Sequence, residues 1–317
     1  MRTLLNIILL IALGGAAIIA EAQRLNGFDI NEPLIPAAAI EKGGPPRDGI
    51  PSIDSPLFVA VDEAGFLEPD DRVLGISHGG KSKAYPVKIL NRHEIVNDWL
   101  DERPVVVTYC PLCGSGIAFS AGVDGKELTF GVSGLLYNSD VLLYDRETGS
   151  LWSQIAAKSV NGPLKGNKLT QWPLQHTTWE DWRRRFPNTR VLSTNTGFTH
   201  IDYDRDPYKQ YKNSSRLMFP VSNTDKRLKN KDWVLGVIAG GQARAYPLGS
   251  FRKKDSPITD QIGNVIVTVE FDNEHQMAVA VDQDGKALAS IQLYWFAWAA
   301  FHPDTSIWNC KEGSRRC

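Results

Sequence analysis

Short apolar runs separated by glycine-rich or polar turns recur along the chain and predict β-strands. Residues 73–76 (VLGI) and 84–87 (AYPV) flank Gly79 and Gly80, which suit a hairpin turn because glycine accepts positive φ without steric cost. Residues 105–109 (VVVTY) are β-branched and apolar, which is typical of a strand buried on both faces. Residues 139–145 and 151–154 predict another hairpin around the turn at 147–149.

A short helix is expected where the pattern changes near residue 178. Thr178 is suited to be its N-cap, and Trp179 and Trp182 lie three residues apart on one helical face. Pro187 ends this helix, and the two tryptophans are expected in the core. Because strands outnumber helices, the sequence predicts an α+β fold that is β-rich, with mainly antiparallel strands and a few short helices.

The same pattern occurs twice, which indicates an internal duplication. The offset between matched segments is 161 residues from Gly75 to Gly236, and it falls to 116 residues from Trp179 to Trp295. The first copy therefore carries an insert near residues 130–173 that the second copy lacks. The matched segments are 71–86 with 232–247, 107–108 with 267–268, 124–126 with 284–286, and 179–189 with 295–305.

These patterns divide the chain into five parts. A signal peptide or N-terminal anchor is followed by a Pro/Gly-rich lead-in, a first unit with the insert, a second unit without the first unit's cysteines, and a polar tail. Their ranges are 1–22, 23–56, 57–195, 218–308 and 309–317.

The N-terminus indicates a location outside the cytoplasm. No charged residue lies between Arg2 and Glu21, and residues 20–22 (AEA) have the A-x-A form of a signal-peptidase site. The alternative is an uncleaved membrane anchor, since the apolar run is about long enough to span a bilayer. Both interpretations predict a periplasmic or secreted protein, whose contact with the membrane is limited to this segment.

Length and charge narrow the class of protein. A chain of 317 residues suggests about two domains. Its 35 basic and 36 acidic residues give a net charge of −1, which argues against a nucleic-acid partner. No G-x-S-x-G, P-loop or dinucleotide-binding motif is present, so the sequence favours no particular enzyme class and no nucleotide cofactor.

The two copies differ at the end of the strand that contains residues 105–109. The first copy continues as residues 110–116 (CPLCGSG), whereas residues 269–272 of the second copy read VEFD. Two thiolates separated by two residues can face one metal ion, with Gly114 shaping the turn. Cys110 and Cys113 therefore predict a site for a soft or borderline transition metal, zinc or copper, with His93 and Glu94 as further ligands.

The cysteine pair also allows other interpretations. Cys110 and Cys113 could form a reactive thiol centre or the redox dithiol of a thiol–disulfide oxidoreductase, although residues 114–116 (GSG) are a poor start for a helix. They could instead form a structural disulfide in a non-enzymatic binding module. Cys310 and Cys317 most simply pair with each other in the polar tail.

Four polar residues of the insert are candidates to line a pocket beside the cysteines. Turn and strand-edge roles explain them equally well. They are Asn138, Asp140, Asp145 and Gln154.

Several of these motifs together resemble a bacterial family catalogued as domain of unknown function 3179. The residues that carry the resemblance are 84–86 (AYP), 92–98 (RHEIVND), 108–119 (TYCPLCGSGIAF), 151–154 (LWSQ) and 296–305 (FAWAAFHPDT), within about 43–308. The resemblance implies an exported bacterial protein and supports His93, Cys110 and Cys113 as residues to test. It implies no activity.

Overall fold

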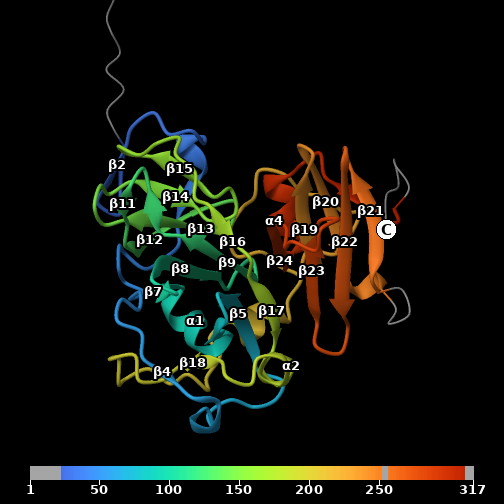
Figure 1. The fold of residues 1–317 in the computed structure, drawn as a ribbon. Helices are drawn as coiled ribbons and strands as arrows, with labels where there is room; N and C mark the ends of the chain where they lie inside the picture. The colour runs from blue at the N-terminus through green and yellow to red at the C-terminus, as the bar shows by residue number, and fades with distance from the viewer. Residues whose placement is uncertain (1–22, 252–255, 311–317) are drawn as a thin grey trace, which may run out of the picture.

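The computed structural model describes residues 23–251 and 256–310, and β-strands predominate in them (Figure 1). Strands account for 42% of the chain and helices for 12%, and the sheets are mainly antiparallel. The predicted β-rich fold with few short helices is confirmed. The expected signal peptide or anchor at 1–22 and the tail residues 311–317 lie outside the described residues.

Five sheets of three to five strands form most of the molecule, and together they look like a five-bladed propeller. In spatial order, the first sheet contains β15 (Lys158–Asn161), β14 (Leu151–Ser153), β13 (Asp140–Asp145), β12 (Phe130–Tyr137) and β3 (Ile40–Lys42). The second contains β16 (Gln171–Trp172), β9 (Ser115–Ser120), β8 (Arg103–Cys110) and β7 (Ile95–Leu100).

The other three large sheets follow the same mainly antiparallel plan. One contains β17 (Gln175–Thr178), β5 (Arg72–His78), β6 (Lys81–Pro86), β18 (Arg190–Leu192) and β4 (Phe58–Val59). Another contains β24 (Ser290–Tyr294), β19 (Trp233–Ala239), β20 (Gln242–Pro247) and β25 (Ser306–Ile307). The last contains β21 (Ile258–Ile262), β22 (Val265–Asp272) and β23 (Met277–Val281).

Short hairpins and helices complete the fold. The hairpins pair β1 (Gln23–Leu25) with β2 (Phe28–Ile30) and β10 (Gly122–Val123) with β11 (Lys126–Glu127). The α-helices are α1 (Val87–His93), α2 (Trp179–Arg185), α3 (Lys209–Lys212) and α4 (Trp295–Phe301), and the 3-10 helices are η1 (Ala37–Ala39), η2 (Val61–Glu63) and η3 (Leu248–Ser250). In the described part of the chain, no helix combines the length and the apolar character that crossing a membrane requires.

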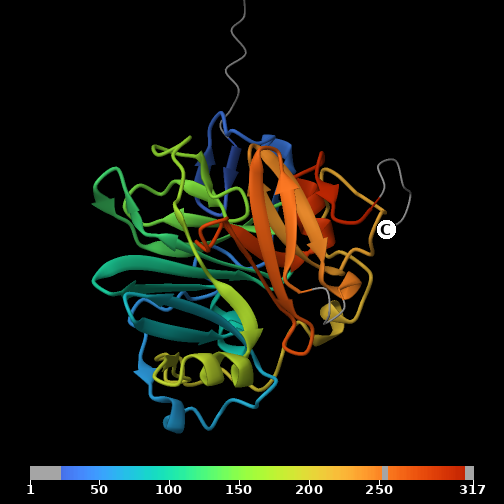
Figure 2. The same cartoon turned by 45° about the vertical axis from the view of Figure 1, so that its right-hand side comes forward.

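The hairpin predicted around Gly79 and Gly80 is β5–β6. Both glycines have positive φ, +57° and +77°, and His78 pairs with Lys81 across the turn. β19 and β20 form the same hairpin, with Gly240 at φ +53°. Figure 2 shows the sheets of the last third of the chain, in orange and red, beside those of the earlier residues.

Each of these hairpins packs against the tryptophan of a short helix. A Cβ atom on Gly75 would lie 2.3 Å from the ring of Trp182, and one on Gly236 would lie 2.2 Å from the ring of Trp298. Nε1 of Trp182 donates a hydrogen bond of 3.0 Å to Thr189, and that of Trp298 donates one of 2.9 Å to Thr305. The helix predicted after Thr178 is α2, and Thr178 is its N-cap. The predicted duplication is compatible with these contacts, and it stays a prediction.

Candidate functional site

Cys110 and Cys113 lie at the two sides of one tight turn between adjacent strands. Cys110 ends β8 and pairs with Ser115, the first residue of β9, so that the chain reverses over four residues. Gly114 has φ +66° in this turn, and a Cβ atom there would lie 2.6 Å from the ring of Trp233. Both cysteines are fully buried, and both are free thiols.

A second tight turn brings Asp140 to the same place. Tyr137 of β12 pairs with Asp140 of β13, so Asn138 and Ser139 alone form the turn, and both have positive φ (+53° and +65°). This backbone directs the carbonyl oxygen of Ser139 at the sulfur atoms, 3.3 Å from Sγ of Cys113 and 3.8 Å from Sγ of Cys110. Asp140 follows immediately, and it is also buried.

These two turns create a compact set of three donor groups. One sulfur atom each from Cys110 and Cys113 and one carboxylate oxygen of Asp140 all lie within 4.8 Å of one another. Two thiolates and one carboxylate are ligands that zinc accepts. The arrangement is therefore suited to hold one metal ion.

Burial makes negative charge at this site unfavourable in the absence of a cation. It raises the pKa of Asp140 to about 7 and raises the pKa values of Cys110 and Cys113. The pKa of Glu94 rises to about 8, first because of burial and then because of the nearby Asp140 carboxylate. A bound cation would offset these costs by attracting the same groups in their charged forms.

Asp140 is fixed through one oxygen, which leaves its other oxygen for a ligand. Oδ2 accepts a hydrogen bond of 3.1 Å from the backbone N–H of Ile155. Oδ1 is buried and has no hydrogen bond of ordinary geometry in the described part of the chain, although the thiols of Cys110 and Cys113 lie close enough to the carboxylate to lower its pKa. A buried carboxylate oxygen without a partner is costly, and a metal ion would satisfy it.

The later part of the chain closes over the cysteine turn. The hydroxyl of Tyr211 donates a 3.0 Å hydrogen bond to the carbonyl oxygen of Leu112, and the N–H of Tyr294 donates a 2.8 Å bond to that of Cys113. The ring of Trp233 lies against Gly114. Four cavities of the described residues are lined by residues other than the two cysteines and Asp140.

The structure places His93 apart from the group of three ligands. Its Nδ1 lies 2.7 Å from the carbonyl oxygen of Pro51, and its Nε2 lies 2.7 Å from the hydroxyl of Tyr203. Both ring nitrogens are thus engaged, because α1 directs this buried side chain toward residues 51 and 203. Asp140 lies with the two cysteines, whereas the sequence suggested His93 as the further ligand.

Glu94 is connected to the strand that ends in Cys110, although it is not one of the three grouped ligands. Its backbone carbonyl accepts a 2.7 Å hydrogen bond from the N–H of Tyr109, the residue before Cys110. Its carboxyl group is near enough to raise the pKa of Cys110, an effect smaller than that of burial. With its pKa raised to about 8, the Glu94 carboxyl is mostly protonated at neutral pH and becomes negatively charged beside the cysteines only at higher pH.

The other expected pocket residues have structural contacts. Gln154 supports the cysteine turn, because it accepts a 2.7 Å hydrogen bond from Ser115 and donates a 2.8 Å bond to Thr108. Asn138 accepts a 2.7 Å bond from the N–H of Ser222. Asp145 lies at the far end of β13, where it accepts a 2.8 Å bond from Nε1 of Trp152.

Another acidic group already has cations beside it. Asp181, Asp272 and His275 also lie close together, but the carboxylate of Asp181 forms ion pairs with Arg184 and Arg185. His275 lies 2.8 Å from a carboxylate oxygen of Asp272. The group that contains Cys110 has no such cation among the described ion pairs, so it is the better candidate.

Sequence reasoning placed Asp140 beside a pocket and did not identify it as a ligand. The local signal was the Asn138–Ser139 pair, because asparagine tolerates the left-handed conformation that a two-residue hairpin turn needs. Cys310 is disulfide-bonded, whereas Cys110 and Cys113 are free thiols. The free thiols favour a metal or thiol centre over a structural disulfide at Cys110 and Cys113. Cys317 lies outside the described residues.

The sequence model of one protein family matches residues 47–288. The chain belongs to the family described as "Protein of unknown function (DUF3179)". The predicted resemblance is thereby confirmed, and the match includes both the cysteine turn and Asp140. No curated protein and no solved structure matches this DUF3179 chain. The residues of this chain are therefore the basis for a proposed function.

Proposed function

We propose that this DUF3179 protein binds one soft or borderline transition-metal ion through Cys110, Cys113 and Asp140. The observation that carries the proposal is the convergence of two sulfur atoms and one carboxylate oxygen within 4.8 Å in a buried place. The buried Oδ1 of Asp140 supports it, because that atom has no hydrogen bond of ordinary geometry and needs a positively charged or hydrogen-bonding partner.

Zinc fits this donor set better than copper does. Zn²⁺ accepts thiolate and carboxylate ligands together, whereas soft cuprous ion favours sulfur over carboxylate oxygen. When bound, zinc would be held by Cys110, Cys113 and Asp140 and would supply a Lewis acid. The residues around it fix the ligands: Ile155 holds Asp140, and Gln154 holds the start of β9 after Cys113.

The redox-dithiol and reactive-thiol alternatives receive less support. A nucleophilic cysteine needs a lowered pKa, commonly from the N-terminus of a helix. Cys110 and Cys113 instead lie in a turn between two strands, and burial raises both of their pKa values. These features favour metal ligands over a catalytic dithiol.

Metal analysis of the full chain, purified without an affinity tag and loaded with Zn²⁺ or Cu⁺ in separate samples, tests the proposal. We expect about one zinc ion per wild-type chain after removal of excess metal. Cys110→Ser, Cys113→Ser and Asp140→Asn should each bind zinc at least about 10-fold more weakly, because each removes one ligand charge. Asp98→Asn is the matched control, since it changes a buried carboxylate that is paired with Lys83 elsewhere.

Equal metal content in the wild type and the three ligand variants would contradict the proposal, and so would negligible content in all of them. Thiol alkylation provides a second measurement. Zinc should protect Cys110 and Cys113 from an alkylating reagent in partly unfolded protein, whereas a dithiol without metal affinity would react equally with and without zinc.

We further propose that the protein is exported. The uncharged run between Arg2 and Glu21 and the A-x-A pattern at residues 20–22 support a cleaved signal peptide. N-terminal sequencing of the protein isolated from its native host tests this, with a mature chain that begins near residue 23 as the expected result.

We also propose that the chain contains two copies of one unit. Matched contacts support this: Asp71 accepts a 3.0 Å bond from the N–H of Glu68, and Asp232 accepts a 2.9 Å bond from that of Lys229. Likewise, Tyr85 donates to Asp98 and Tyr246 donates to Asp260. The sequence offset is 161 or 162 residues in each of these matches, as in the repeated segments.

A further inference from the structure

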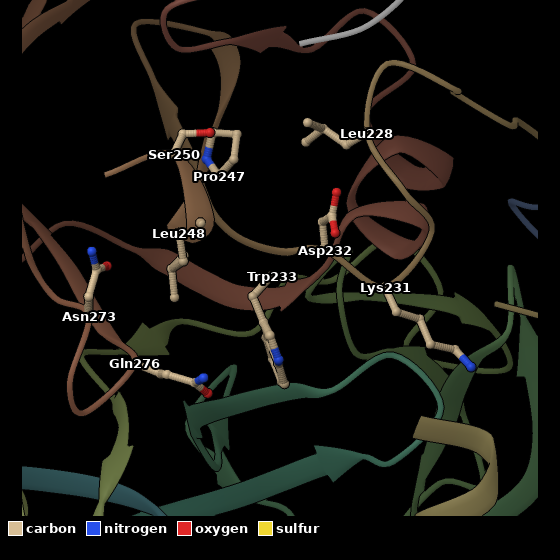
Figure 3. Close-up of a pocket in the computed structure, with 10 residues that line it drawn as sticks. Leu228, Lys231, Asp232, Trp233, Pro247, Leu248, Ser250, Asn273 and Gln276 are labelled. Carbon is tan, nitrogen blue, oxygen red and sulfur yellow. The ribbon is translucent and has the colours of Figure 1, made fainter. Parts of the chain in front are cut away.

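A cavity of about 570 Å³ lies beside the start of β19 (Figure 3). Its walls come from three places: the segment before β19, the 3-10 helix η3, and the turn between β22 and β23. Leu228, Asp232, Trp233, Leu248 and Gly249 are among the residues that line it. The cavity is separate from the group formed by Cys110, Cys113 and Asp140.

The matching place in the first half is filled by a lysine side chain. Nζ of Lys88, in helix α1, lies 3.0 Å from a carboxylate oxygen of Asp71 and 3.0 Å from one of the exposed Asp204, and it donates a 3.0 Å hydrogen bond to the carbonyl oxygen of Phe66. Asp71 and Asp232 have matching sequence positions and matching hydrogen bonds to the backbone. Lys88 is two residues after Pro86, and Gly249 is two residues after Pro247.

The second half therefore keeps the carboxylate and lacks the ammonium group. Asp232 forms no ion pair within the described ranges 23–251 and 256–310. Lys231 also borders the cavity, but its ammonium group bonds to the carbonyl oxygens of Tyr211 and Ser214, and Figure 3 shows its side chain directed away from Asp232. A Cβ atom on Gly249 would meet nothing within 4 Å, so a side chain has room to begin there, at the wall of the cavity.

We propose that this cavity binds a small organic cation with an ammonium group. The ammonium group takes the place that Nζ of Lys88 occupies in the first half and pairs with the carboxylate of Asp232. Trp233 borders the cavity, and its ring packs against Gly114, His176 and Tyr294. Leu228 and Leu248 give the carbon chain of the ligand an apolar surface. Residues 252–255 are not part of the proposed site.

The test uses n-butylammonium as the probe, because it has the length and charge of a lysine side chain. Ligand-observed NMR on the full chain measures its binding, with n-butanol as the neutral probe of similar shape. We expect n-butylammonium to bind and n-butanol to bind at least about 10-fold more weakly, since a charged hydrogen bond is lost.

Two variants of the cavity sharpen the test. Asp232→Asn should weaken n-butylammonium binding about 10-fold while its amide oxygen still accepts the bond from the N–H of Lys229. Gly249→Lys should also abolish binding, because the new side chain supplies its own ammonium group to Asp232. Asp71→Asn is the matched control in the first half and should leave probe binding unchanged.

Thermal unfolding checks that each variant is folded before binding is compared. Equal binding of n-butanol and n-butylammonium would overturn the proposal, and so would unchanged binding to Asp232→Asn and Gly249→Lys. The absence of binding to the wild type at millimolar probe would overturn it as well. None of these outcomes depends on the metal content of the protein, so the metal proposal is tested separately.

Discussion

The sheet around β5 and the sheet around β19 have closely similar frameworks and different surroundings. In both, a glycine of the first hairpin strand lies under a tryptophan ring, and the indole N–H of that tryptophan bonds to a threonine. The first half adds the cysteine turn and helix α1, whereas the second half has η3 and an open cavity. The shared contacts hold the two sheets in a similar form, and the two proposed binding sites lie where the halves differ.

The largest expected effect comes from the two glycines under the tryptophan rings. Gly75→Ala and Gly236→Ala should each lower the free energy of unfolding by about 2–3 kcal/mol, because the added methyl group overlaps a buried ring. Urea denaturation of both variants measures this, and similar losses would strengthen the comparison. Gly65→Ala is the control, since its Cβ would meet nothing within 4 Å.

If only one of the two variants lost stability, the two halves would not be equivalent at this contact. Such a result would mean that one half repacks around its tryptophan while the other does not.

Removing one tyrosine hydroxyl in each half should have a smaller effect. Tyr85 donates a 2.6 Å hydrogen bond to Asp98, and Tyr246 donates a 2.8 Å bond to Asp260. Tyr85→Phe and Tyr246→Phe should each cost about 1–2 kcal/mol, since a carboxylate loses one donor. Thermal or urea unfolding checks this, and Tyr137→Phe is the control because its ring contact with Phe301 does not need the hydroxyl.

The smallest expected effect is a pH dependence in the second half. Burial alone would raise the pKa of Asp260, but hydrogen bonds from Arg244 and Tyr246 outweigh it and hold that pKa below its usual value. The ionised carboxylate therefore stabilises the folded state above the ordinary aspartate pKa of about 4, and this contribution is lost as the pH falls through the lowered value.

Asp260→Asn measures that contribution directly. The difference in unfolding free energy between the wild type and Asp260→Asn should be largest near neutral pH and should shrink as the pH falls below about 4. A difference that stays constant from pH 7 to pH 3 would show that the carboxylate charge contributes nothing.

Local sequence patterns were enough to predict the hairpin at Gly79–Gly80, the buried strand before Cys110 and the helix that Thr178 caps. Each of these depends on neighbouring residues alone: a turn conformation, an apolar run, a hydrogen-bonding side chain. The partner of Cys110 and Cys113 could not be found in this way. Asp140 reaches them because the turn between β12 and β13 packs against the turn between β8 and β9, which is a contact between sheets.

His93 is the reverse case, a ligand suggested by the sequence whose side chain lies apart from the two cysteines. It is close to Glu94 in sequence and was a reasonable ligand by residue type, yet α1 directs it to Pro51 and Tyr203. The direction of a side chain at the end of a helix depends on which elements pack around it. The local sequence around His93 does not show that Pro51 and Tyr203 pack beside its ring.

The pairing of β3 with β12 has a practical consequence for the segment before residue 57. β3 is one edge strand of the five-stranded sheet that contains β12, with Ile40 opposite Tyr137. A shortened chain that begins after β3 would expose the edge of β12 at residues 135–137, right beside the Asn138–Ser139 turn, while the pairing of β12 with β13 would remain. Exposed strand backbone of this kind promotes aggregation, so we expect a chain without β3 to aggregate more readily than the full chain.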